Sequence, residues 1–183
     1  MPKASRFISI IVLLVALAGC GGGQTAKSSA SSASSARAST VVAACSQAGT
    51  KHLAKTRFLL HAGLAIGAFR HFVYVPFKAG KFKAGAPGRI KSMAVAGAAA
   101  LFAYHELKVA KGYAEADKTL CKLVAPIDAL TAKLSALGAG LKSGKLDEAG
   151  INGAASNVAS FKGSATKLGA PITETVPPSV PAS

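Results

Sequence analysis

Acidic residues are missing from the first 105 positions of this 183-residue chain, and the first of them is Glu106. Residues 20–105 contain eleven lysines and arginines, whereas residues 106–183 contain nine of these bases together with all seven acids. The first half therefore produces a positive field that attracts anionic partners. The same charge is also consistent with a surface that only keeps the protein in solution.

Motifs of known enzyme chemistry are also absent from the sequence. There is no Gly-x-Ser-x-Gly elbow, no complete His-Glu-x-x-His pair and no dinucleotide fingerprint. Residues 139–145 lack the first glycine of a phosphate-binding loop and are followed by Leu146 in place of serine or threonine. Because four histidines and seven acids leave few general acids or bases, we predict no enzyme activity, no catalytic residue and no cofactor.

The N-terminal hydrophobic run is too short to cross a membrane. The apolar residues from Phe7 to Leu17 number eleven, and a spanning helix needs about 20. A short apolar run that follows Lys3 and Arg6 is typical of a secretion signal. A spanning helix is therefore the less favoured alternative, and we expect a signal peptide over residues 1–19.

The end of that run, Leu17-Ala18-Gly19-Cys20, resembles the lipobox of bacterial lipoproteins. The resemblance implies that Cys20 becomes the N-terminus of the mature protein and carries acyl chains, palmitate among them, which anchor it in the lipid bilayer. Two or three acyl chains form a durable anchor. It also implies a bacterial cell membrane or outer membrane location, with the protein facing outside the cytoplasm. Nucleic acid is not an expected partner outside the cytoplasm. The alternative to a lipobox is an ordinary signal peptide that is cleaved without lipidation.

Only two cysteines, Cys45 and Cys121, follow Cys20. An even pair in a chain exported to an oxidising compartment predicts a disulfide, and two unpaired buried thiols are the alternative. Their separation of 76 positions excludes a local Cys-x-x-Cys motif.

The composition divides the mature chain into a linker, one domain and a tail. Residues 20–44 are rich in serine, alanine and glycine and predict a flexible linker. Residues 171–183 contain four prolines and no periodic apolar face, which predicts a disordered tail. Between them, residues 45–170 are rich in alanine, leucine and lysine and lack strand-like alternation, so we expect an all-α domain.

Four helices are predicted in this domain, arranged as an up-and-down bundle built on a long antiparallel hairpin. The first begins between Gln47 and Lys51 and ends before Pro76, because a proline disfavours helical geometry in the preceding residue. After a loop over residues 76–88, the second runs from Arg89 toward Val124. The third has Pro126 in its first turn, where the missing N–H has no consequence.

Apolar stripes at helical spacing predict the core of the last two helices. The first stripe comprises Leu120, Leu123, Ile127, Leu130, Leu134, Leu137 and Leu141. The second, in the fourth helix, comprises Ile151, Ala154, Val158, Phe161, Ala165 and Leu168.

Hairpin arms of matched length, linked at the cysteines, predict a register in which facing positions sum to 166. This register places the glycines of a Gly-x-x-x-Gly pair, Gly63 and Gly67, against alanines of the second helix, and close packing of the two helices is the expected reason. It also places His61 opposite His105. Two facing imidazoles are weak candidates for a metal or haem site, and an ordinary structural pair is the favoured interpretation.

The far end of the hairpin, residues 74–91, combines five bases with aromatic residues. Bases attract an anionic surface and aromatic rings anchor in it, so this end is the predicted binding site. The predicted contact residues are Lys78, Lys81, Lys83, Arg89, Lys91, Phe77 and Phe82. A solvated loop with its rings packed against the bundle is the alternative.

The sequence as a whole predicts a non-enzymatic envelope lipoprotein that binds through this basic loop. Its expected partner is an anionic lipid, a wall polymer or an envelope protein. Because residues 58–69 and 92–105 contain no lysine, arginine, aspartate or glutamate, a membrane-perturbing hairpin is an alternative function. A histidine-based metal or haem carrier is a weaker one.

Overall fold

The computed structural model describes residues 45, 49 and 51–180. The signal peptide, Cys20 and the whole linker (residues 20–44) therefore lie outside the described residues. Within the described part, all regular secondary structure is helical and no strand is present, so the predicted all-α class is confirmed.

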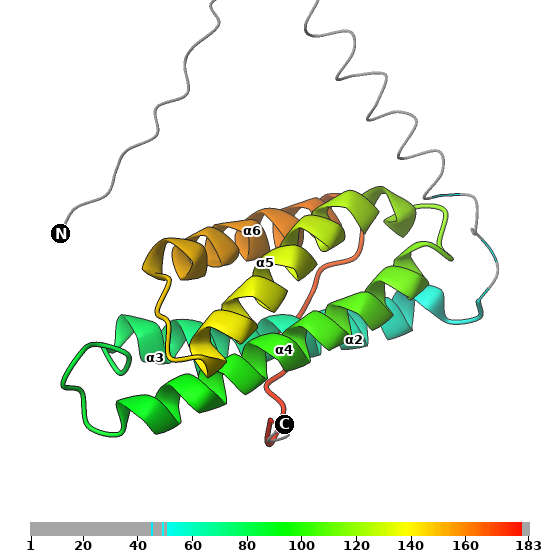
Figure 1. Ribbon diagram of the computed structural model, residues 1–183. Helices are drawn as coiled ribbons and strands as arrows, with labels where there is room; N and C mark the ends of the chain where they lie inside the picture. The colour runs from blue at the N-terminus through cyan, green and yellow to red at the C-terminus, as the bar shows by residue number, and fades with distance from the viewer. Residues whose placement is uncertain (1–44, 46–48, 50, 181–183) are drawn as a thin grey trace, which may run out of the picture.

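Four long helical segments make up the domain. The first consists of α2 (Ala54–Phe69), a π-helical turn η1 (Arg70–Tyr74) and α3 (Val75–Lys78), which follow one another without a break. The others are α4 (Arg89–Ala114), α5 (Val124–Lys142), preceded by a 3-10 turn η2 (Leu120–Leu123), and α6 (Glu148–Lys167). The α2–α3 segment and α4 lie side by side in one layer, and α5 and α6 cover them as a second layer (Figure 1).

The core lies between these two layers. All seven residues of the first predicted apolar stripe are buried, from Leu120 to Leu141, and five of the six in the second are buried, with Leu168 half-buried. Both stripes are therefore confirmed as core. The helix α4 contributes mainly alanines, among them Ala96, Ala100 and Ala103, and these small side chains let α4 pack closely on both α2 and α5.

The crossing of α4 and α5 depends on two glycines. A Cβ atom on Gly97 would lie 3.2 Å from the carbonyl oxygen of Gly138 and 3.0 Å from the backbone nitrogen of Lys142. A Cβ on Gly138 would lie 2.7 Å from the Leu101 side chain. Close packing of α4 on α5 therefore needs glycine at positions 97 and 138. Neither position belongs to the predicted Gly-x-x-x-Gly pair.

The prediction that the first helix ends before Pro76 is wrong. The π-helical turn brings the N–H of Val75 to the carbonyl oxygen of Arg70, and a new α-helical turn then starts with Pro76 at its beginning. Proline is tolerated in a first helical turn because its missing N–H has no partner to lose there. The helix therefore continues through Pro76 to Lys78.

Two other predicted helix ends also differ from the structure. The first helix begins at Ala54, after Leu53, whose backbone is left-handed (φ 56°). The second begins at Arg89 as predicted but ends at Ala114, well before Val124. The chain turns there because the Asp117 carboxylate accepts the N–H groups of Thr119 and Leu120 and starts the 3-10 turn. Pro126 lies in the first turn of α5, as predicted.

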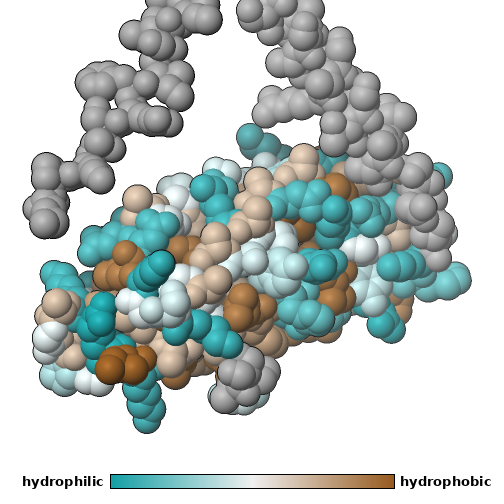
Figure 2. Space-filling view, in the orientation of Figure 1, coloured by the Kyte–Doolittle hydropathy of each residue, from teal (hydrophilic) through white to brown (hydrophobic). Residues whose placement is uncertain are grey.

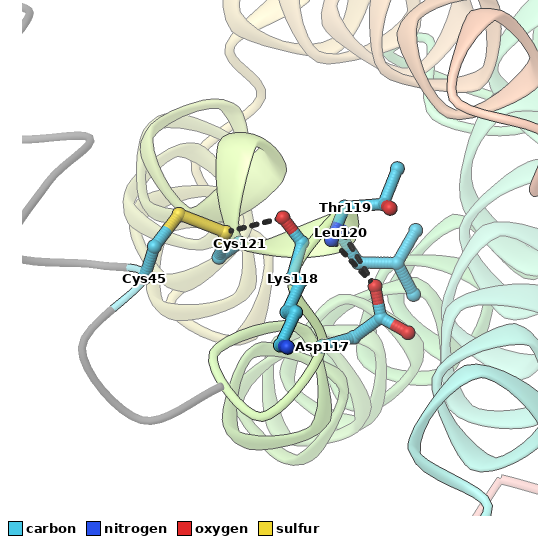
Figure 3. Close-up of a disulfide and its surroundings, with 6 residues drawn as sticks. All are labelled: Cys45, Asp117, Lys118, Thr119, Leu120 and Cys121. Atoms are coloured by element: carbon cyan, nitrogen blue, oxygen red, sulfur yellow. Dashed lines mark hydrogen bonds between the residues drawn. A yellow bond between two sulfur atoms is a disulfide. The ribbon is translucent and has the colours of Figure 1, made fainter. Parts of the chain in front are cut away.

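Cys45 and Cys121 meet at the end of the domain where α4 turns into α5 (Figure 3). Their Cα atoms lie 5.1 Å apart and their sulfurs are joined in a disulfide, while the N–H of Gly49 donates to the carbonyl oxygen of Ala116 nearby. Such a bond closes a loop of about 75 residues, which the chain-entropy treatment equates with roughly 4 to 5 kcal/mol of stabilisation.

The C-terminal segment 171–180, which we call the strap, corrects the prediction of a disordered tail. After α6 it runs in an extended conformation across the helices (orange to red in Figure 1), and its residues Ile172 and Pro177 are buried. The N–H of Thr175 donates to the carbonyl oxygen of Gly63 at 3.0 Å. The described part of the tail is therefore ordered against α2.

The strap also explains the Gly-x-x-x-Gly pair. A Cβ atom on Gly63 would collide with the carbonyl oxygen of Thr173, and one on Gly67 with that of Thr175. The prediction that these glycines face the alanines of the second helix is therefore wrong, because they form a groove for the strap.

One segment of the described residues, Ala54–Lys78, is long and apolar enough to cross a membrane by length and composition. About half of the segment is buried inside the domain. Core helices of soluble proteins have the same properties, so this observation is weak evidence for membrane insertion.

Candidate functional site

The predicted binding loop lies at the end of the domain opposite the disulfide, at residues 79–88, which we call the tip loop (Figure 1). Two glycines shape it: Gly80 (φ 72°) reverses the chain after α3, and Gly88 (φ 67°) precedes α4. Both conformations are in the left-handed region that favours glycine. Backbone hydrogen bonds from Lys83 to Gly80 and from Arg89 to Ala86 complete the loop.

The aromatic residues of this end do not serve as exposed anchors. Phe82 is only 1% exposed and belongs to the hydrophobic core, and Phe77 is half-buried, with its ring centroid 6.5 Å from that of Phe82. The prediction that Phe82 contacts a partner is therefore wrong. The same prediction for Phe77 has less support, because that ring is half-buried. The alternative, with rings packed against the bundle, describes this end correctly.

Arg89 also has a structural task. Its Nε donates to the carbonyl oxygen of Phe82 at 2.9 Å, and the side chain is half-buried. Arg89 therefore fixes the tip loop over α4.

The four predicted lysines are all exposed, but they divide between two hollows. Lys81 and Lys91 line a groove of about 350 Å³ whose other walls include Phe72, Pro76 and Val95, and which we call the tip groove. None of the residues that line the tip groove is acidic. Lys78 and Lys83 line a second hollow of about 290 Å³ that also contains Glu148 of α6. An anionic ligand is thus opposed by a carboxylate in the second hollow and by none in the tip groove.

Aliphatic residues take the place of the expected aromatic anchors. Ile90 is 82% exposed, and Val75 and Val95 are 51% and 40% exposed. All three lie in the helices next to the tip loop, and Figure 2 shows hydrophobic (brown) and hydrophilic (teal) residues side by side at this end of the domain. Sequence reasoning missed them; Ile90, isolated between Arg89 and Lys91, was the available signal.

The histidine pair predicted from the register is not formed. His105 is exposed, whereas His61 Nδ1 lies 2.6 Å from a carboxylate oxygen of Glu106 and its ring stacks on Tyr113. Within the described residues, no group of three histidine, cysteine or acidic side chains is placed to hold a metal ion. His61 is therefore part of a hydrogen-bond and ring-stacking cluster that links α2 to α4.

The fold and the tip groove together define an all-helical domain with a cationic end. No protein-family model matches this chain, and neither a curated protein nor a solved structure matches it. Its function is therefore inferred from the described residues and from the lipobox resemblance.

Proposed function

We propose that this protein is a non-enzymatic lipoprotein of the bacterial envelope, and that its helical domain binds an anionic envelope component through the tip groove. The observation that carries the proposal is the groove's composition. Lys81 and Lys91 supply positive charge, the walls supply apolar contact, and no carboxylate lines the groove. Polybasic contacts to an anionic lipid surface contribute on the order of 1 kcal/mol per lysine.

The finer arrangement that we propose is an up-and-down bundle in which successive helices alternate in direction. The tip loop and the disulfide then lie at opposite ends of the domain. Acyl chains on Cys20 would provide the anchor, and the linker would have a root-mean-square span of roughly 25 to 30 Å. Such a tether lets the tip groove meet either the membrane that holds the anchor or a neighbouring anionic polymer.

Sedimentation with anionic vesicles tests the proposal. The purified domain without acyl chains is mixed with phosphatidylglycerol-containing vesicles, and the variant Lys81→Gln/Lys91→Gln is compared with the wild type. We expect the variant to lose at least tenfold in affinity. The matched control is Lys118→Gln/Lys122→Gln, which removes the same charge from exposed lysines at the disulfide end. Equal losses in both variants would show that only net charge matters and would refute the tip groove as the contact.

A membrane-perturbing hairpin is the second candidate function, and the apolar segment Ala54–Lys78 is the observation that favours it. The same vesicles, loaded with a self-quenched dye, distinguish the two candidates. Binding without dye release at saturating protein supports the binding module, whereas release supports the hairpin.

A further inference from the structure

A separate pocket of about 350 Å³ lies where the π-helical turn meets α6. Its floor is apolar and includes Ile66, Phe69 and Val158. Small-molecule sites typically have volumes of about 300 to 1,000 Å³ and apolar walls with a few polar groups. The pocket is at the small end of this range, which limits a ligand to a medium-length acyl chain or a single ring system.

The pocket has one polar corner, formed by Arg70 from the π-helical turn, Lys162 from α6 and Glu174 from the strap. The Glu174 carboxylate accepts hydrogen bonds from Arg70 Nη1 at 2.9 Å and from Lys162 Nζ at 2.6 Å. Two cations thus converge on one carboxylate at the edge of an apolar cavity. Isolated π-helical turns occur frequently at functional sites, and here the turn supplies Arg70 and Tyr74 to the pocket wall.

We propose that this pocket binds a small carboxylate amphiphile, such as a medium-chain fatty acid, whose head group replaces Glu174 between Arg70 and Lys162. The carboxylate of Glu174 shows that the two cations accept this head group in this geometry. The apolar floor then receives the body of the ligand.

In this arrangement, Glu174 of the strap competes with the ligand head group for Arg70 and Lys162. Its backbone donates one hydrogen bond to α2, from Thr175 to Gly63, and Glu174 supplies its two ionic contacts. Displacement of the Glu174 side chain removes both ionic contacts but does not itself break the backbone bond, so a ligand can enter while the strap loosens without being released. This site is independent of the tip groove.

Calorimetric titration of the domain with decanoate tests the proposal, with decanol as the uncharged probe. We expect decanoate to bind and decanol to bind at least tenfold more weakly. Glu174→Gln keeps the size of the side chain but removes the competing charge, so decanoate should bind several-fold more tightly. Arg70→Gln/Lys162→Gln should weaken decanoate binding at least tenfold.

Two further variants distinguish binding in this pocket from binding elsewhere on the domain. Ala159 is exposed and lines the pocket, so Ala159→Phe should block it and abolish binding while the helical circular dichroism is unchanged. The tip variant Lys81→Gln/Lys91→Gln should bind decanoate like the wild type. Absence of wild-type binding, equal affinity for decanol, or no gain in Glu174→Gln would each overturn the proposal.

Discussion

Gly67 allows a test of where the strap lies, because an alanine at this position adds one methyl group that faces the strap. The Cβ atom of an alanine there would collide with the backbone carbonyl of Thr175, which cannot rotate away like a flexible side chain. Overpacking of this kind costs about 1 to 3 kcal/mol, whereas alanine gains about 1 kcal/mol over glycine in a helix interior. We therefore expect Gly67→Ala to lower the free energy of unfolding in urea by about 1 kcal/mol.

Gly163 provides the matched control for that substitution. It also lies within a helix, α6, but a Cβ atom there would meet nothing within 4 Å. Only the helix-propensity gain remains, so Gly163→Ala should stabilise the domain by about 0.5 to 1 kcal/mol. If Gly67→Ala stabilised the protein as much as Gly163→Ala does, the strap would not lie in the Gly63–Gly67 groove.

At the scale of one element, the attachment of the strap to the helices changes with pH through one titratable group, Glu174. Burial alone raises the pKa of Glu174, but the hydrogen bonds and charges of Lys162 and Arg70 outweigh it and hold that pKa below its ordinary value of 4.5. A group with a lowered pKa in the folded state contributes stability above its unfolded pKa and loses it as the pH falls through the folded one. The strap should therefore be held at neutral pH and loosened in acid.

Amide hydrogen exchange at Thr175 measures this loosening. Its N–H donates to Gly63, and we expect its protection, corrected for the intrinsic exchange rate, to fall as the pH drops below the ordinary glutamate pKa. In Glu174→Gln the protection should be lower at neutral pH and nearly independent of pH in this window. Identical pH profiles in the two proteins would mean that Glu174 does not fasten the strap.

The elements differ in how far the sequence predicts them, and the reason is the range of the contacts that fix each one. The stripe from Leu120 to Leu141 and the position of Pro126 depend on spacing within η2 and the α5 helix that directly follows it, so periodicity predicts α5. The strap has no periodicity, and Glu174 meets Arg70 across 104 positions. Its order is decided by glycines and cations on distant helices, which local patterns do not reveal.

The helix that contains Pro76 illustrates a different limit. The expected helix end depended on the tendency of the residue before a proline to avoid helical geometry, but Val75 has helical backbone angles (φ −63°, ψ −49°) where the π-helical turn ends. The register prediction also failed in detail. Glu106, one position from the predicted His105, is the residue that meets His61. Because successive residues of a helix point about 100° apart, an error of one position is enough to replace one facing side chain by another.

The candidate site was predicted in its charges but not in its apolar contacts. Lysines in a glycine-rich loop remain solvated, so the exposure of Lys81 and Lys91 follows from their chemistry. The position of Phe82 depends on whether space exists beneath the loop, which sequence alone does not show. The core provides that space for Phe82, whereas Ile90 lies on the surface.

For the whole molecule, the separation of the tip groove from the disulfide end predicts how the domain meets an anionic surface. The helix α4 has 26 residues and is therefore about 39 Å long, whereas charges are screened beyond about 10 Å at 0.1 M salt. An anionic surface that attracts the tip lysines thus has little effect on the other end, where acids such as Asp117 and Asp128 offset the bases. We expect the domain to bind end-on.

Fluorescence quenching by lipids that carry a nitroxide head group measures this orientation. An environment-sensitive amino acid at Ala84, which is exposed in the tip loop, should be quenched on vesicle binding, and the same label at the exposed Lys118 should not. Raising the salt from 0.1 to 1 M shortens the screening length to about 3 Å and should abolish both the binding and the quenching at position 84. Equal quenching at the two positions would mean that the domain lies flat, in which case the apolar segment Ala54–Lys78, and not the tip groove, makes the contact.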